Sequence, residues 1–206
     1  MKKLFRAVVF GLFLVGCVLV GGGSAYSSGP TNDLKPVLDD LMQVLADKDL
    51  KGVANTAKRR TKIMSEIKRG FDFTEMSKRV LGQTWRDISS EERVHFTALM
   101  TKLLENVYVG KLEGYSGQKV EFSGEMIKGK RAQVSTMLVD HDMQIPIHYI
   151  MQLDGAKWMV YDINIEGVSL VRNYREQFKS ILRTEKFTGL VKIIEEKNRS
   201  FLETGQ

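Results

Sequence analysis

Three histidines are the side chains of this chain best suited to metal binding or proton transfer. His141 stands between Asp140 and Asp142, so three possible cation ligands follow one another. Aspartates are common in turns because their side chains hydrogen-bond the local backbone, so we interpret this triplet as a turn. His95 and His148 fall in different predicted elements, and the chain has no H-E-x-x-H spacing. The pattern predicts no metal site.

Two carboxylates could perform general acid–base chemistry. Asp162 and Glu166 lie four residues apart in a predicted strand, so they would share a face. A catalytic carboxyl needs burial and a substrate pocket, and the apolar neighbours of Asp162 make it the candidate. The interpretation we favour is that Asp162 lies on the outer face of the strand or bonds to a nearby turn.

The first 25 residues have the pattern of a signal peptide. Lys2, Lys3 and Arg6 precede an apolar run over residues 7–20. That run is short for a membrane span, which needs ~20 apolar residues. Small residues then permit cleavage after Ala25. The pattern predicts an exported protein.

A lipoprotein signal is the alternative. Residues 14–17 resemble a lipoprotein cleavage box, in which residues 1–16 are removed and Cys17 is acylated. Cys17 is the only cysteine, so a chain cut after the longer signal has no disulfide and no thiolate chemistry. The formal charge of +6 falls to about +3 without the three cations of the signal. A net charge of about +3 is too small for the strongly basic signature of nucleic-acid-binding proteins.

The main charge feature of the mature chain is a basic cluster on a predicted helix. It consists of Lys58, Arg59, Arg60 and Lys62. A solvated helix face is the simplest interpretation. Docking to an acidic partner or to anionic lipid head groups is the functional alternative.

Apolar periodicity divides the chain into helices, a sheet and two closing helices. Asn32 or Asp33 is expected to cap the first helix, and Ser89 and Glu92 form a capping box before the longest one. Further helices are predicted over residues 53–68, 73–81, 90–112, 169–182 and 184–202.

The middle of the chain alternates with period two and has short turns, which predicts an antiparallel meander. Its four strands are expected at residues 119–123, 131–139, 145–153 and 158–165. The element order predicts an α+β fold. Residues 26–206 are expected to form a single domain with a helical subdomain over about 31–112.

The last predicted strand and the helix after it carry the strongest pattern. Strict alternation would place one set of side chains on one face and a second set on the other. The first set is Met159, Tyr161, Ile163 and Ile165, and the second is Trp158, Val160, Asp162 and Asn164. Gly167 ends the strand and Ser169 caps the next helix.

The sheet has more apolar surface than a single sheet needs. The predicted strand at 145–153 is partly apolar on both faces, whereas one dry face is sufficient. Methionines fall near these surfaces and suit adaptable apolar binding. The additional apolar surface either packs against helices as core or forms the wall of a cavity. The pattern leaves both interpretations open. An exported chain of this kind is expected to bind rather than catalyse.

Several short motifs occur in an order and spacing typical of one protein family. They are Phe71-Asp72-Phe73, residues 80–86, Ser89-x-x-Glu92-Arg93, Trp158-x-x-Tyr161-Asp162, Glu166-Gly167-Val168-Ser169 and Leu182-Arg183-Thr184. On these motifs the chain resembles the MlaC family, also called the toluene-tolerance auxiliary family. The resemblance covers nearly the whole mature chain.

The resemblance implies a soluble, monomeric periplasmic phospholipid carrier that is not an enzyme. Helices would pack on a cone-like antiparallel sheet of four or slightly more strands, around a deep apolar pocket that takes the acyl tails. The expected partners are an inner-membrane ABC transporter with an MCE-domain subunit and an outer-membrane lipoprotein–porin complex. No cofactor and no nucleic acid are expected, since phospholipid is the cargo. A lipidated Cys17 would instead leave the carrier tethered.

A pocket for acyl chains must be dry and lined from both strand and helix. We expect its lining to include Val80, Leu103, Val107, Tyr108, Tyr149, Met151, Ile163 and Val171. Two alternatives stay open. One is an enzyme of a related cone-shaped fold that uses Asp162 and a tyrosine. The other is a periplasmic adaptor that binds no ligand and docks through the basic cluster at Lys58 to Lys62.

Overall fold

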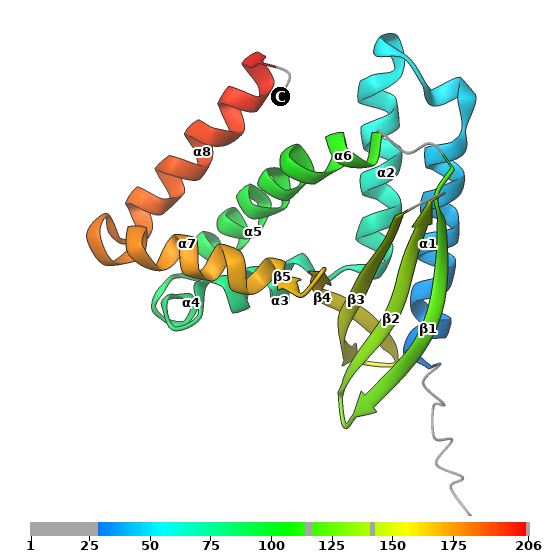
Figure 1. The fold of residues 1–206 in the computed structure, drawn as a ribbon. Coiled ribbons are helices and arrows are strands. Elements are labelled where there is room, and N and C mark those ends of the chain that lie inside the picture. The colour runs from blue at the N-terminus through cyan, green and yellow to red at the C-terminus, as the bar shows by residue number, and fades with distance from the viewer. Residues whose placement is uncertain (1–28, 114–116, 141–142, 205–206) are drawn as a thin grey trace, which may run out of the picture.

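The computed structural model describes residues 29–113, 117–140 and 143–204. The predicted signal peptide, the Cys17 alternative and the His141–Asp142 part of the predicted turn lie outside these residues. The described chain forms two lobes (Figure 1). One lobe is an antiparallel sheet with the first two helices, and the other consists of the helices from the middle and the end of the chain.

The helices and strands follow the predicted order. The helices are α1 Pro30–Ala46, α2 Thr56–Gly70, α3 Phe73–Leu81, α4 Thr84–Asp87, α5 Ser90–Leu104, α6 Gly110–Glu113, α7 Leu170–Thr184 and α8 Lys186–Thr204, with short turns η1 Lys48–Leu50 and η2 Val53–Asn55 and a π-helical turn η3 Glu105–Val109. The strands are β1 Lys119–Lys128, β2 Arg131–Asp140, β3 Met143–Asp154, β4 Lys157–Ile165 and β5 Val168–Ser169, paired in that order. The α+β prediction and the meander are therefore confirmed. The short α4 and the two-residue β5 were not predicted.

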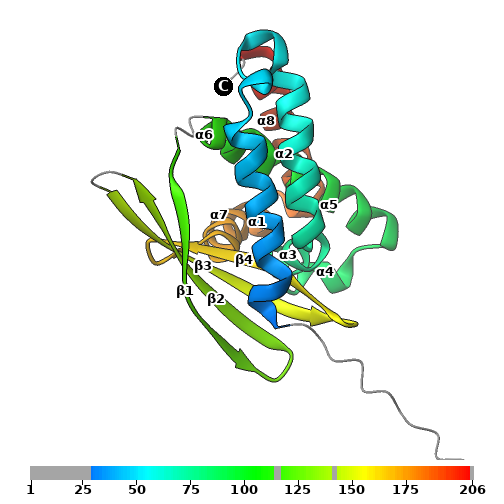
Figure 2. The same cartoon turned by 90° about the vertical axis from the view of Figure 1, so that its right-hand side faces the viewer.

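Helix α1 lies along one face of the sheet, with α2 beside it (Figure 2). Its buried side chains follow one another at helical spacing and include Leu34, Val37, Leu38, Leu41 and Leu45. The predicted cap is wrong. The helix begins earlier, at Pro30 after Gly29, and the Asp33 carboxylate instead accepts a hydrogen bond from the Trp158 amide of β4 (2.7 Å). A proline in the first turn removes no helical hydrogen bond.

The longest predicted helix is confirmed, with one irregularity. Ser89 and Glu92 form the capping box at the start of α5. At Glu105 the helix widens into the π-helical turn η3 and then continues as α6. Such turns often lie at functional sites, because the extra residue redirects the side chains that follow.

A buried pair of asparagines holds α8 against this irregular helix. The Asn106 side-chain amide of η3 donates to the Asn198 side-chain oxygen (3.1 Å), and the Asn198 amide donates to the Leu99 carbonyl (3.0 Å). Both asparagines are buried. A buried polar pair is stable only when its hydrogen bonds are made, so this pair fixes the position of α8 along α5.

Strand β4 does not alternate as the sequence predicts. A β-bulge between β3 and β4 shifts the register, so Ile150 faces Asp162 while Met151 faces Val160. One extra residue in a strand reverses the faces of all residues beyond it. Trp158 and Val160 therefore lie in the same apolar cluster as Ile163, and the predicted separation of these residues onto two faces is wrong.

The β4–β5 turn sets the direction in which α7 leaves the sheet. Its two central residues, Glu166 and Gly167, both have positive φ, of 50° and 85°. This is the geometry of a type I′ hairpin turn, in which glycine is favoured at the second position. The Ser169 hydroxyl then accepts from the Arg172 amide at the start of α7 (3.0 Å), as predicted for a cap.

The apolar interior is divided into three clusters rather than one. The helical cluster joins α3, α5, α7 and α8, the sheet cluster joins α1 to β2, β3 and β4, and a third joins α1 and α2 to Val109 of η3. Phe73 packs against all three. We call the boundary along which the two lobes meet the seam.

We predict that replacing Asn198 with alanine destabilises the protein by about 1–3 kcal/mol, because the buried Asn106 amide loses its acceptor. Urea unfolding followed by circular dichroism measures this change. Changing both Asn106 and Asn198 to leucine should restore part of the loss, since the Asn106 amide is then no longer buried without an acceptor. The exposed Asn173→Ala is the control, expected to change the free energy of unfolding by less than about 0.5 kcal/mol. An Asn198→Ala protein as stable as the wild type would contradict the prediction.

Candidate functional site

The sheet face that meets α1 consists of apolar cross-strand rows. The strand register places Ala132, Met151 and Val160 in one row and Val134, Tyr149 and Ile163 in the next. Two further rows follow toward the β2–β3 turn, and they contain Phe122, Thr136, Ile147 and Ile165, then Val120, Leu138 and Ile145. We call this the inner face.

Burial decreases along the inner face from row to row. Met151 and Val160 are fully buried beneath α1, whereas Ile147, Ile163 and Ile165 are only half-buried. The row nearest the β2–β3 turn is half-buried throughout. Apolar side chains are thus covered at one end of the inner face and incompletely covered at the other, which we call its open end. An incompletely covered apolar face indicates a surface for an apolar ligand.

The π-helical turn and α7 supply half-buried apolar side chains on the helical side of the seam. Val107 and Tyr108 of η3 and Val171 of α7 pack at the edge of the helical cluster. The side chains of Tyr108 and Tyr174 are hydrogen-bonded to each other, which ties the π-helical turn to α7. Burial raises the pKa of both phenols. Both hydroxyls therefore stay neutral, as an apolar site requires.

The structure separates the eight predicted lining residues into two groups. Val80, Leu103, Val107, Tyr108 and Val171 belong to the helical cluster, while Tyr149, Met151 and Ile163 belong to the sheet cluster. Val80, Leu103, Tyr149 and Met151 are buried within these clusters. Val107, Tyr108, Ile163 and Val171 are half-buried and lie at the cluster edges. Sequence reasoning did not single out Ile147, Ile165 and Phe122, although their alternation with polar neighbours was visible.

Two surface cavities lie along the seam. The first, of about 770 Å³, is lined by Phe71, Phe73 and Met159 and by polar residues of α2, α3 and α5. The second, of about 1050 Å³, lies between α3, α4 and α7 and includes Val80 and Val171 from the predicted set. Both volumes are close to the 300–1,000 Å³ typical of ligand sites.

Asp162 has a structural role at the start of α7. One carboxylate oxygen accepts from the Ser169 hydroxyl (2.6 Å), and the other accepts from the Val171 amide (3.0 Å). A carboxylate at a helix N-terminus satisfies unpaired amides and interacts favourably with the helix dipole. Glu166 lies exposed in the turn, so the two residues do not form the carboxylate pair considered for catalysis. The favoured interpretation of Asp162 is confirmed.

The other candidates for chemistry have local partners. His95 contacts Glu195 (3.0 Å), His148 contacts Ser135 (3.0 Å), and Asp140 accepts from Gln118 (2.7 Å). Among the described residues, no group of three histidine, cysteine or acidic side chains is placed to hold a metal ion. Within the same ranges, no helix has the length and hydropathy needed to cross a bilayer.

The predicted basic cluster is smaller than expected. Lys58 and Lys62 are exposed on α2, but Arg59 is buried and its guanidinium donates to the Leu45 carbonyl (3.0 Å). Arg59 thus stabilises the packing of α2 on α1. The cluster does not form a continuous cationic face.

Comparison with known proteins gives the family. The profile of the MlaC protein family matches residues 35–196. The chain belongs to the MlaC family. A relative in this family is the intermembrane phospholipid transport system binding protein MlaC of Haemophilus influenzae, which is 26% identical over 207 residues, covering 93% of this chain and 91% of the relative.

A solved structure has the fold of this MlaC family chain. The phospholipid-binding protein from Ralstonia solanacearum, solved in complex with a phospholipid, superposes with a TM-score of 0.78. The match covers 85% of this chain and 99% of that one at 23% identity. The two-lobed architecture is therefore shared with a protein that holds a phospholipid.

We predict that Tyr149 makes the protein less stable at alkaline pH. Burial raises the pKa of Tyr149 to about 12, and its hydrogen bond with Thr136 acts in the opposite direction. Below pH ~10 the phenol is protonated in both states, so it has no effect. Between about pH 10 and pH 12 only the unfolded chain releases the proton, so the free energy of unfolding falls by up to roughly 2–3 kcal/mol. Urea unfolding across this range should show a smaller fall for Tyr149→Phe, and equal falls would contradict the prediction.

We predict that Asp162→Ala lowers the free energy of unfolding by about 1–3 kcal/mol, because two hydrogen bonds at the start of α7 are lost. Thermal or urea unfolding measures the change. Asp87→Ala, at an exposed position on α4, is the matched control and should have little effect. Equal stabilities of the two variants would argue against the structural role.

Proposed function

We propose that this chain is a periplasmic phospholipid carrier that binds the acyl chains of its cargo along the seam, between the open end of the inner face and the helical wall. The observation that supports the proposal is that half-buried apolar side chains lie at the edges of both the sheet cluster and the helical cluster. They include Ile163 of β4, Val107 and Tyr108 of the π-helical turn and Val171 of α7. A solved protein of the same fold holds a phospholipid.

The physics of acyl-chain binding fits this site. Each methylene removed from water contributes ~0.8 kcal/mol, so a ~16-carbon chain contributes on the order of 12 kcal/mol before the costs of binding. The protein needs no catalytic group for this, only apolar walls.

The proposal gives Asp162 a structural role rather than an enzymatic one. Both of its carboxylate oxygens accept hydrogen bonds at the start of α7. A general acid or base must be free to exchange a proton with its substrate.

The proposed place of the chain in a transport system follows from its family. The relative from H. influenzae is named as a binding protein of an intermembrane phospholipid transport system. We propose that this chain acts between an inner-membrane ABC transporter with an MCE-domain subunit and an outer-membrane lipoprotein–porin complex. Removal of residues 1–25 would release it into the periplasm, whereas acylation of Cys17 would tether it.

Native mass spectrometry of protein purified from cells, followed by lipid identification, tests the proposal. A phospholipid bound at a defined stoichiometry is the expected result. Protein that carries no lipid and takes up none from vesicles would overturn it and favour the adaptor alternative.

We predict that Val107→Asp reduces the bound lipid per protein to roughly a tenth or less, because a carboxylate at the seam would be buried beside the acyl chains. Val94→Asp, on the preceding helix α5 at a position that is 72% exposed, is the matched control and should retain lipid. Met151 is unsuitable for this test, since it is fully buried and a charge there would unfold the sheet lobe. Circular dichroism confirms that both variants fold. Unchanged lipid content in Val107→Asp would count against the site.

A further inference from the structure

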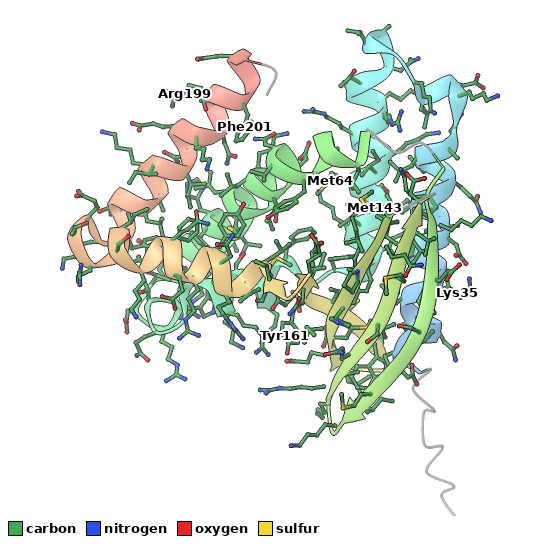
Figure 3. All side chains as sticks on the ribbon, in the orientation of Figure 1. Lys35, Met64, Met143, Tyr161, Arg199 and Phe201 are labelled. Carbon is green, nitrogen blue, oxygen red and sulfur yellow. The ribbon has the colours of Figure 1, made fainter. Side chains whose placement is uncertain are left out.

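The cavity between α3, α4 and α7 is surrounded by positive charge. We call it the basic groove. Its cations are Lys78, Arg79, Arg86, Arg172, Arg175 and Lys179, and its carboxylates are Glu75, Asp162 and Glu176. These residues are spread over about half of the chain, so no sequence window shows the cluster. The groove lies beside Tyr161, which Figure 3 labels close to the β5 end of α7.

Two of the six cations share one carboxylate of the groove. Glu75 pairs with Lys78 (2.9 Å) and with Arg79 (2.8 Å). The Arg79 guanidinium also lies over the Tyr161 ring, 3.8 Å from its centroid, and donates to Gln152. Asp162 accepts hydrogen bonds from the start of α7. Lys78 and Arg79 therefore already have partners within the protein.

The other four cations are exposed and unpaired. Among the described residues, Arg86, Arg172, Arg175 and Lys179 have no carboxylate within ion-pair distance. Three of them recur on α7 at steps of three and four residues, so they form one stripe along that helix. Arg86 of α4 contributes from the opposite wall. Unpaired cations that converge on one concavity produce a local positive potential.

The groove also has apolar lining residues. They are Val80, Leu81, Trp85, Val171 and Leu182, together with Tyr161. A concavity that combines apolar residues with cations matches an amphipathic helix with acidic flanks, because such a helix offers an apolar face and carboxylates together.

We propose that the basic groove binds an acidic, amphipathic segment of a partner protein. The proposal does not require the acyl site to lie where it is placed above, since the unpaired cations are exposed and belong to none of the apolar clusters. It assigns docking to α3, α4 and α7 instead of the exposed lysines of α2.

The test uses a synthetic amphipathic peptide of leucine and glutamate at helical spacing, titrated into the full mature protein. Trp85 lies in the groove, so its fluorescence reports binding, and calorimetry gives the dissociation constant. The charge-reversal variant R172E/R175E should bind roughly tenfold more weakly or worse. The matched control K58E/K62E makes the same charge change on α2 and should bind like the wild type. Affinity should also fall with added salt, which screens exposed charges.

The possible outcomes are distinct. Selective loss of binding in R172E/R175E, with lipid content by native mass spectrometry unchanged, supports the proposal. Equal loss in both variants indicates general charge attraction and overturns it. Failure of the peptide to bind the wild type also overturns it, as does binding to anionic phosphatidylglycerol vesicles but not to the peptide. Loss of lipid in R172E/R175E would identify the groove as a head-group site and overturn the docking role. Absence of lipid from the wild type and from every variant would contradict only the proposed function as a phospholipid carrier.

Discussion

The carboxylate of Asp162 fixes the direction in which α7 leaves the sheet, and the rest of the structure depends on that direction. It holds the Ser169 hydroxyl and the Val171 amide at once, so the first turn of α7 is tied to β4 at two points. The bulge beside Asp162 keeps its side chain off the inner face, where it would otherwise be buried among apolar residues. As a result, α7 presents Val171 and Tyr174 to the helical cluster and Arg172 and Arg175 to the basic groove. One helix therefore serves two surfaces of opposite chemistry.

Division of the interior into separate clusters is compatible with the proposed binding of a large apolar ligand. A single close-packed core resists opening, because separating its side chains exposes apolar surface to water and lowers stability. Here the sheet cluster and the helical cluster are separate, and Phe73 packs against both. The π-helical turn also contacts the sheet lobe, because Val109 is buried in the cluster of α1 and α2. The Asn106–Asn198 pair holds the same turn against α8.

Prediction from sequence succeeded for features that depend on residues close together in the chain. The helix from Phe73 to Leu81, the capping box at Ser89 and the Ser169 cap all appear as predicted, because periodicity and capping involve residues within a few positions of one another. It failed at β4, because a bulge depends on the pairing with β3 and not on the strand's own residues. It also misplaced the first cap, because Asp33 is engaged by Trp158, which is 125 residues away. Four of the eight residues predicted to line the pocket are buried within the clusters, and four are half-buried at the cluster edges, a difference that the sequence did not show.

The sequence by itself determined the fold class, the order of the elements and the family, since these follow from periodic patterns and motifs carried along the chain. Only the tertiary structure decided which apolar residues are core and which remain half-covered, because burial depends on the element that packs above each residue. It also decided where the charge gathers. The Lys58 to Lys62 run looked basic but contains a buried arginine, whereas Arg86, Arg172 and Arg175 converge only when α4 and α7 are folded together. Surface chemistry is set by neighbours in space, and those neighbours are distant in the chain.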